Sequence, residues 1–322
     1  MRRRILKRSD ILSMMIISAA ISMGVTIIVF VVYRVEQQTS TTIQPQVIPV
    51  IVAWTGFFSD SLKTPLLKTL ENCPLKCDFI DRTEQKLYNL SASAYVFHGR
   101  DMNVADLPAQ HSNHLNVLML MESPYHTGSA IHQVPSNYFN ATITYRTDSR
   151  YFHPYGRFVP RSENDKTDDI ITDEQLSAAV HKKTKGSLIF ISNCNTPSKR
   201  EHLIRKLMKV TPVTIRGQCE KIFDNNDDTK SSLCQDDCDD DSLIANHRFY
   251  LSFENSICND YVTEKFFLRI SQILLPIVIK RKIYEDANIP HKSFIALDDF
   301  NSMEELGDYL NVLRINDTAY LK

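Results

Sequence analysis

The sequence predicts an α/β protein with two open parallel sheets, one in each half of the chain. Short β-branched or aromatic runs alternate with stretches whose apolar residues recur at helical spacing, which is typical of parallel strands joined by crossover helices. The 322 residues are enough for about two domains. A polar stretch ends near residue 185, so we place a domain boundary there and expect a ligand cleft between the domains.

The individual elements are expected to be short. Strands are predicted at 47–57, 94–97, 116–121, 187–192, 213–215, 249–253 and 277–279. Helices are predicted at 198–209, 261–275 and 303–313. The acidic segment 224–241 is expected to be an exposed loop.

The N-terminus is predicted to anchor the chain in a membrane. Residues 11–33 carry no charge and are long enough, at about 1.5 Å per residue, to cross a bilayer core as one helix. Basic residues precede this segment, so residues 1–10 are expected to be cytoplasmic and the rest of the chain lumenal. Residues 34–49 are typical of a short stem. The alternative, a cleaved signal peptide, normally has a shorter apolar region.

Two further features suit a lumenal protein. Asn89, Asn140 and Asn316 each begin an N-x-S/T sequon and are candidate N-glycosylation sites. Seven cysteines in an oxidising compartment predict disulfides with at least one thiol left over, although the sequence does not determine their pairing.

Composition and missing motifs exclude several classes of protein. Basic and acidic residues number 37 and 38, so no excess of positive charge suits a nucleic acid. No glycine-rich dinucleotide or P-loop motif is present, and neither a G-x-S-x-G nor an H-E-x-x-H motif occurs. An anionic ligand must therefore be bound by a few individually placed cations.

The segment 249–267, FYLSFENSICNDYVTEKFF, carries the densest group of candidate binding residues. Its strand delivers polar side chains at the carboxyl end, where open α/β sheets bind ligands. Asp260 is expected to cap the next helix, with Glu264 and Lys265 in its first turn. A helix N-terminus suits a diphosphate, and Lys265 adds a charge there. The alternative is that Glu264 and Lys265 are only a solvated pair.

This segment resembles the donor-site signature of the α1,3-fucosyltransferases, glycosyltransferase family 10, in which F-E-N-S and Y-[VI]-T-E-K recur together. Four other stretches resemble elements of the same family, and the similarity extends over residues 95–322. They are MESP at 121–124, YRTDSRYFHPYG at 145–156, Ser192-Asn193-Cys194 with Arg200, and PHKSFIALDDF at 290–300.

The resemblance implies two Rossmann-like domains facing a central cleft, the GT-B arrangement, after one transmembrane helix. Residues 50–185 are then the acceptor-binding domain and residues 186–322 the GDP-fucose-binding domain of a type II Golgi membrane protein. The implied reaction is inverting transfer of L-fucose from GDP-β-L-fucose to the 3-OH of GlcNAc in glycoprotein or glycolipid glycans.

The resemblance also implies roles for individual residues. Glu122 matches the general base, although a plain strand-end carboxylate is the alternative. The donor-binding candidates are Arg200, Asn255, Tyr261, Glu264 and Lys265, with Ser192, Asn193 and Glu254 as secondary candidates. Arg200 and Lys265 are expected to neutralise the diphosphate. The element at 145–149 has no role that the sequence assigns, and His98, His126 and His153 are alternative bases.

The chain departs from the family pattern in two places. A glycine-containing stretch, L-A-G-S-x-P-V-V-x-G, is replaced by SQILLPIVIK at 271–280, which has bulkier residues and begins the cationic run Lys280, Arg281 and Lys282. These cations are expected either to alter the donor loop or to assist diphosphate binding. The sequence given also stops where relatives usually continue with a cysteine-bearing tail.

Two rival functions remain at this point. One is a metal-dependent glycosyltransferase in which Asp239 and Asp241 hold Mn²⁺. The other is a catalytically impaired, membrane-anchored protein that binds glycans or GDP. We expect the fucosyltransferase to require no metal and Mn²⁺ to act only as a stimulant. Its expected partners are GDP-fucose, a GlcNAc-containing glycan and the membrane.

Overall fold

The computed structural model describes residues 48–58, 60–64, 67, 74–160, 171–223, 232–233 and 239–322. The predicted cytoplasmic tail, the predicted transmembrane segment 11–33 and nearly all of the predicted stem lie outside these ranges. Within the ranges, no helix combines the length and the apolar character needed to cross a bilayer. Residues from Val50 to Lys322 form one compact unit that contains two six-stranded parallel sheets.

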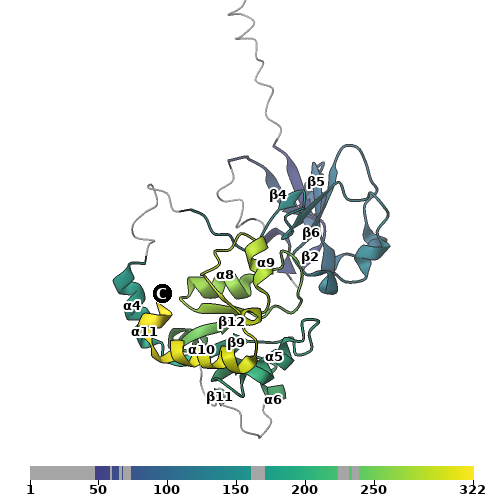
Figure 1. Cartoon of the computed structure of the whole chain (residues 1–322). Helices are drawn as coiled ribbons and strands as arrows, with labels where there is room; N and C mark the ends of the chain where they lie inside the picture. The colour runs from purple at the N-terminus through teal and green to yellow at the C-terminus, as the bar shows by residue number, and fades with distance from the viewer. Residues whose placement is uncertain are drawn as a thin grey trace, which may run out of the picture. The chain divides into compact units, whose positions relative to one another are not determined.

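The first sheet has the strand order β4-β1-β5-β6-β7-β8 (Figure 1). Its strands are β1 (Val50–Ala53), β4 (Asp78–Asp81), β5 (Ala94–His98), β6 (Leu115–Leu120), β7 (Ala141–Thr144) and β8 (Tyr151–Phe152). Counted along the chain this order is 2-1-3-4-5-6, which begins as in flavodoxin-like sheets. A two-stranded antiparallel ribbon joins β2 (Gly56–Phe57) to β3 (Asp60–Ser61).

Short helices connect these strands. They are α3 (Arg82–Tyr88) and the single turns η1 (Gly99–Asp101), η2 (Val104–Asp106), η3 (Pro124–His126) and η4 (Ala130–Gln133). Asp81 begins α3 through a capping box, because its carboxylate accepts from the backbone of Glu84 while the Glu84 side chain accepts from the backbone of Asp81. The core beneath this sheet is small and includes Val96, Val117 and Met119.

The second sheet has the strand order β11-β10-β9-β12-β13-β14. Its strands are β9 (Lys185–Phe190), β10 (Val213–Arg216), β11 (Ser232–Leu233), β12 (His247–Leu251), β13 (Leu275–Val278) and β14 (Ile295–Ala296). Counted along the chain this order is 3-2-1-4-5-6, the order of dinucleotide-binding folds. The second sheet therefore has the strand order expected of a Rossmann-like domain, whereas the first sheet has a different order.

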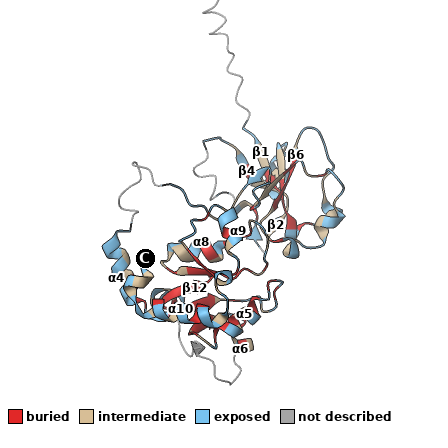
Figure 2. Cartoon of the chain, viewed as in Figure 1, coloured by how far each residue is buried: buried red, intermediate tan, exposed pale blue. Residues whose placement is uncertain are grey.

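Helices surround the second sheet. They are α4 (Asp173–Lys182), α5 (Arg200–Leu207), α6 (Glu220–Phe223), α7 (Asp240–Asn246), α8 (Glu264–Ser271), α9 (Arg281–Asp286), η6 (Leu297–Asp299), α10 (Met303–Ile315) and α11 (Asp317–Tyr320). The central strand β12 is buried along its whole length (Figure 2). Ile204 and Leu207 of α5 and Leu306 and Leu310 of α10 are fully buried in the core against this sheet.

Two predicted elements are corrected by the structure. The helix expected at 261–275 is shorter, because Asp260 has φ 62° and Thr263 caps α8 instead, its hydroxyl accepting from the backbone of Lys265. The prediction of a loop at 224–241 is wrong at its C-terminal end. Asp239 caps α7 by accepting from the backbone of Ser242, so the acidic run starts a helix.

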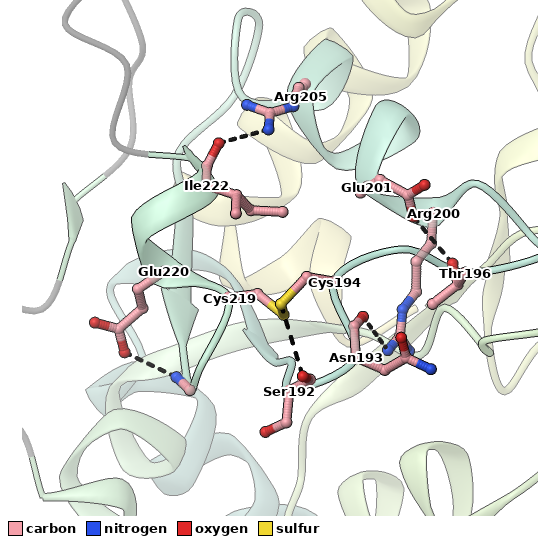
Figure 3. Close-up of a disulfide and its surroundings, with 11 residues drawn as sticks. Ser192, Asn193, Cys194, Thr196, Arg200, Glu201, Arg205, Cys219, Glu220 and Ile222 are labelled. Carbon is pink, nitrogen blue, oxygen red and sulfur yellow. Dashed lines mark hydrogen bonds between the residues drawn. A yellow bond between two sulfur atoms is a disulfide. The ribbon is translucent and has the colours of Figure 1, made fainter.

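One predicted disulfide is present among the described residues. Cys194, just after β9, is bonded to Cys219, just before α6, so the bridge joins the ends of two neighbouring strands (Figure 3). Cys77 and Cys258 are free thiols, and the other three cysteines lie outside the described ranges.

The three sequon asparagines are all exposed. Asn89 ends α3, and Asn316 caps α11 by accepting from the backbone of Ala319. The Oδ1 of Asn140 accepts from the backbone of Asn116, 2.7 Å away. Each is accessible for glycosylation, which stays a prediction.

Candidate active site

The predicted donor residues gather at one edge of the second sheet. Ser192 and Asn193 follow β9, and Glu254 and Asn255 follow β12. Strands β9 and β12 are adjacent and parallel, and the strand order reverses between them. Open α/β sheets bind ligands at this reversal, beyond the carboxyl ends of the strands. The tertiary fold thus brings together residues that are about 60 positions apart in the sequence.

The side chain of Arg200 links the two strand ends at this edge. Its side chain is 3% exposed, and its guanidinium donates to the carbonyl of Phe253 at 2.7 Å. The guanidinium also donates to the carbonyl of Asn193 at 3.2 Å (Figure 3). Burial lowers the pKa of Arg200, and the carboxylate of Glu254 opposes that shift. Two of its donors hold the strand ends together, while its buried Nε has no hydrogen-bond partner among the described residues.

Glu254 lies at the start of α8. Its carboxylate is buried and accepts from the backbone N–H of Thr263 at 2.9 Å and from the Thr263 hydroxyl at 2.8 Å. Burial raises the pKa of Glu254, opposed by Lys265, whose Nζ is 3.4 Å from Oε2. Glu254 therefore occupies the backbone N–H of the capping residue Thr263, one position before the first residue of α8. Binding of a diphosphate at the N-terminus of α8 stays a prediction.

Lys265 lies between two carboxylates. Its Nζ is 2.9 Å from Glu264 and also donates to the hydroxyl of Thr263 at 3.1 Å. Burial favours the neutral amine, but Glu254 and Glu264 outweigh it and raise the pKa of Lys265, so the ammonium stays charged. The Lys265 side chain is 22% exposed and that of Glu264 is 56% exposed. Glu264 and Lys265 are thus more than a solvated pair, because other side chains hold the Lys265 ammonium in place while the Glu264 carboxylate faces outward.

Glu122 follows β6 of the first sheet and contacts the donor segment directly. The hydroxyl of Tyr261 donates to its Oε2 at 3.2 Å, and Nη1 of Arg100 is 3.9 Å from its Oε1. The Glu122 side chain is 19% exposed, so it is accessible to a second substrate. The predicted base and the predicted donor residue are therefore neighbours across 139 residues of sequence.

Next to this contact, a small open pocket, here called the cavity, borders the second sheet. Its lining comprises Ser252, Glu254, Ser256, Ile257, Tyr261, Ile279, Lys280, Ile283 and Tyr284. Lys280 was not among the predicted site residues, although the replaced glycine stretch pointed to it. Of the neighbouring cations, Arg281 pairs with Asp299 and Lys282 with Asp286, so neither lines this cavity.

Two other polar groups mark the same region. The Oδ1 of Asn255 is buried and has no partner among the described residues, so it is available to a ligand. The hydroxyl of Ser123 donates to that of Ser256 at 2.8 Å and lies 3.1 Å from Nδ1 of His126. The sequence placed both serines in matched motifs, MESP and F-E-N-S, but assigned them no role, because their contact exists only once the two sheets are in place.

The alternative bases are histidines, and two of them have polar partners: His126 contacts the Ser123 hydroxyl and His98 contacts Asp101. Nδ1 of His98 is 2.6 Å from the carboxylate of Asp101, and burial lowers the pKa of His153. Ser192 and Asn193 are exposed, and the Asn193 carbonyl is used by Arg200.

The rival metal site has limited geometric support. Asp239 is used as the helix cap of α7, and Asp241 is exposed in the first turn. Among the described residues, no three His, Cys, Asp or Glu side chains are grouped closely enough to hold a metal ion.

The altered stretch after α8 contains a strained residue. Ile273 has φ 59°, a left-handed conformation that glycine adopts freely and a β-branched residue rarely does. Ile273 stands where the family pattern has its first glycine. The structure thus gives the physical reason for that glycine, and this chain keeps the turn without it.

Comparisons with known proteins agree with this geometry. The family model "Fucosyltransferase, N-terminal" matches residues 46–156, and "Glycosyltransferase family 10 (fucosyltransferase) C-term" matches residues 180–322. Alpha-(1,3)-fucosyltransferase fut-1 of Caenorhabditis elegans is 34% identical over 292 residues, covering 90% of this chain and 61% of fut-1. The chain thus spans less than two thirds of that relative.

Two further matches extend the comparison. Alpha-(1,3)-fucosyltransferase fut-5 of C. elegans is 32% identical over 288 residues, covering 85% of this chain and 71% of fut-5. A crystal structure of an α1,3-fucosyltransferase with GDP-fucose shares the fold, with a TM-score of 0.53 at 18% identity, covering 85% of this chain and 80% of that one. The family predicted from the sequence is confirmed: the chain belongs to glycosyltransferase family 10, the fucosyltransferases.

Proposed function

We propose that the chain is an inverting α1,3-fucosyltransferase that moves L-fucose from GDP-β-L-fucose to the 3-OH of GlcNAc in glycoprotein or glycolipid glycans. The observation that carries the proposal is the contact between Tyr261 and Glu122. It brings an accessible carboxylate of the first sheet to the cavity of the second. The names of fut-1 and fut-5 and the GDP-fucose complex of the fold relative support the donor and the linkage.

In the proposed reaction, Glu122 accepts the proton of the acceptor 3-OH while the oxygen of that hydroxyl bonds to the anomeric carbon of fucose. The bond from that carbon to the β-phosphate oxygen breaks, and GDP leaves with the electron pair. Attack from the face opposite the phosphate turns the β-linked donor into an α-linked product. This geometry needs the base and the leaving group on opposite sides of the sugar, in a cleft between the two sheets.

The departing GDP needs positive charge at its phosphates. We assign this role to Lys265, which remains charged between its two carboxylates, and to Lys280 on the cavity wall. The unpaired groups of Arg200 and Asn255 are assigned to the nucleotide. Glu264 faces outward and is assigned to hydroxyls of ribose or fucose. No metal is obligatory in this scheme, and Mn²⁺ is at most a stimulant.

We place the enzyme in the Golgi membrane as a single-pass type II protein with a lumenal catalytic region. The uncharged segment 11–33, the basic residues before it and the three sequons support this location. The Cys194–Cys219 disulfide is of a kind that forms in oxidising compartments.

The test is fucosyl transfer by the full chain in detergent. The purified protein is incubated with GDP-fucose and N-acetyllactosamine, chitobiose-core or LacdiNAc acceptors, with and without EDTA. Glu122→Gln is expected to lower kcat by roughly 10²–10⁴-fold, because it removes the general base but preserves shape. Asp241→Asn, an equally conservative change at an exposed carboxylate, is the matched control.

Each outcome decides between the alternatives. Full activity of Glu122→Gln contradicts the assignment of the base. Activity that EDTA or Asp241→Asn abolishes favours the metal-dependent rival. GDP binding by the unaltered chain, with neither transfer nor hydrolysis of GDP-fucose, favours the catalytically impaired homologue.

A further inference from the structure

The loop between β7 and β8 is the element to which the sequence assigned no role, and it contacts the donor segment at two points. The ring of Tyr145 meets the ring of Tyr261 edge-on, with centroids 5.0 Å apart. The backbone N–H and the hydroxyl of Thr147 both donate to Oδ2 of Asp260, at 3.0 and 2.9 Å. Of these two residues of the loop, Tyr145 is buried and Thr147 is exposed.

The turn that Thr147 holds is strained. Asp260 is a non-glycine residue with φ 62°, a conformation that costs free energy unless neighbouring contacts enforce it. The two bonds from Thr147 supply such contacts. Tyr261 is the next residue, so the position of its side chain depends on this turn.

The hydroxyl of Tyr261 in turn orients Glu122. Burial, and after it the charge of Glu122, hold the pKa of Tyr261 well above its ordinary value, so the phenol remains a hydrogen-bond donor at any assay pH. Its bond to Oε2 restricts the carboxylate and leaves Oε1 for a substrate hydroxyl. The other charged or titratable groups around Glu122 are Arg100, Tyr145 and Tyr155.

The chain just beyond the loop reinforces the arrangement. The hydroxyl of Tyr155 donates to the carbonyl of Met121, the residue before Glu122, at 2.6 Å. A Cβ added at Gly156 would lie 2.4 Å from Cγ of Phe267, so glycine alone allows this close approach to α8. The stretch 145–156 therefore contacts both the base-bearing segment and the donor helix.

We propose that Tyr145 and Thr147 are positioning residues, which set the 260–261 turn so that the Tyr261 hydroxyl orients the Glu122 carboxylate for proton transfer. Neither residue contacts the reacting atoms in this assignment. The inference rests on the proposed role of Glu122 as base, and it gives the loop at 145–149 a function in the same reaction.

Kinetics of single variants of the full chain test the proposal. Tyr145→Leu removes the edge-on ring, and Thr147→Val removes one of two bonds to Asp260. Both are expected to lower kcat, by roughly 10–100-fold and roughly 3–10-fold, with KM for GDP-fucose changed less than about twofold, because misplacing a catalytic group affects the chemical step. Tyr145→Phe and Thr147→Ser keep the ring and the hydroxyl and should restore most of kcat. Tyr151→Leu, the same change at an exposed tyrosine of β8, is the control.

A double variant separates positioning from general damage. In the Tyr261→Phe background, Thr147→Val should no longer lower kcat, because the hydrogen bond that Thr147 positions is already absent. Additive losses of kcat in that double variant contradict the proposal.

The failure of the proposed function is distinguishable from the failure of this inference. If the unaltered chain transfers no fucose to any acceptor, the proposed function fails. The positioning contact is then judged by thermal unfolding of Thr147→Val, Tyr261→Phe and their double variant, where the inference requires less than additive shifts in Tm. Full additivity there overturns it.

Discussion

The two sheets differ in how they hold their functional edges. In the second sheet, α5 and α10 bury their apolar faces in a large core, so the carboxyl ends of β9 and β12 are fixed from within. In the first sheet, α3 buries none of its residues, and Glu122 is held by bonds from outside the sheet. The edge that carries Glu254 and Asn255 is therefore fixed by its own core, whereas Glu122, the proposed base, depends on contacts with that edge.

The largest effect is expected from removing the cation at the edge of the second sheet. Lys265→Ala leaves Glu254 buried without its partner, which should cost about 3–5 kcal/mol of stability and lower fucosyl transfer by roughly 10²–10³-fold. Thermal unfolding and kcat/KM measure the two effects. Lys282→Ala, at a side chain that is 83% exposed, is the control, and equal losses in both variants would falsify the assignment.

A histidine in the same sheet should make its stability depend on pH. His247 is fully buried in β12, and burial lowers its pKa to about 4. Because the folded value lies below the unfolded one of about 6.5, the stabilisation is complete above pH 6.5 and is lost as pH falls through 4, up to about 3 kcal/mol. Urea unfolding at pH 7 and pH 4.5 should show a smaller loss in His247→Gln than in the unaltered chain. The same loss in both chains would contradict this account.

Gly156, in the first half of the chain, lies close to Phe267 of α8, and a substitution at Gly156 tests this contact. Gly156→Ala places a Cβ within 2.4 Å of the Phe267 ring, so we expect about 1–3 kcal/mol of destabilisation and a lower Tm. The double variant Gly156→Ala with Phe267→Leu makes room and should recover part of the loss. A Tm that stays unchanged in the single variant would mean that this contact is not required.

The smallest expected effect concerns the cavity wall. Lys280→Gly restores the residue type of the family pattern and removes one charge from the cavity, so KM for GDP-fucose should rise by roughly 3–10-fold with kcat nearly constant. Initial rates at varied donor concentration measure it, with Lys282→Gly as the matched control. A fall in kcat without a change in KM would instead place Lys280 in the chemical step.

Much of the donor half was predictable because its signals are local. The buried strand β12 begins two residues before its predicted start and ends two residues before its predicted end, and Glu254, Asn255 and Lys265 lie near the strand edge where the sequence placed them. The start of α8 was not predictable, because Asp260 is a good cap by type but adopts φ 62° under the influence of Thr147, more than 100 residues away.

By itself, the sequence determined the family, the alternation of strands and helices, and the residue types that can meet a sugar diphosphate. The family follows from the resemblance of the segment 249–267 and four other stretches to a known signature, and the alternation and the residue types follow from the spacing of a few residues along the chain. Only the tertiary structure decided that Glu254 occupies the start of α8, that Lys280 lines the cavity and that Tyr261 holds Glu122. Such contacts join distant segments, so their partners are set by packing of the two sheets and not by any pattern within one of them.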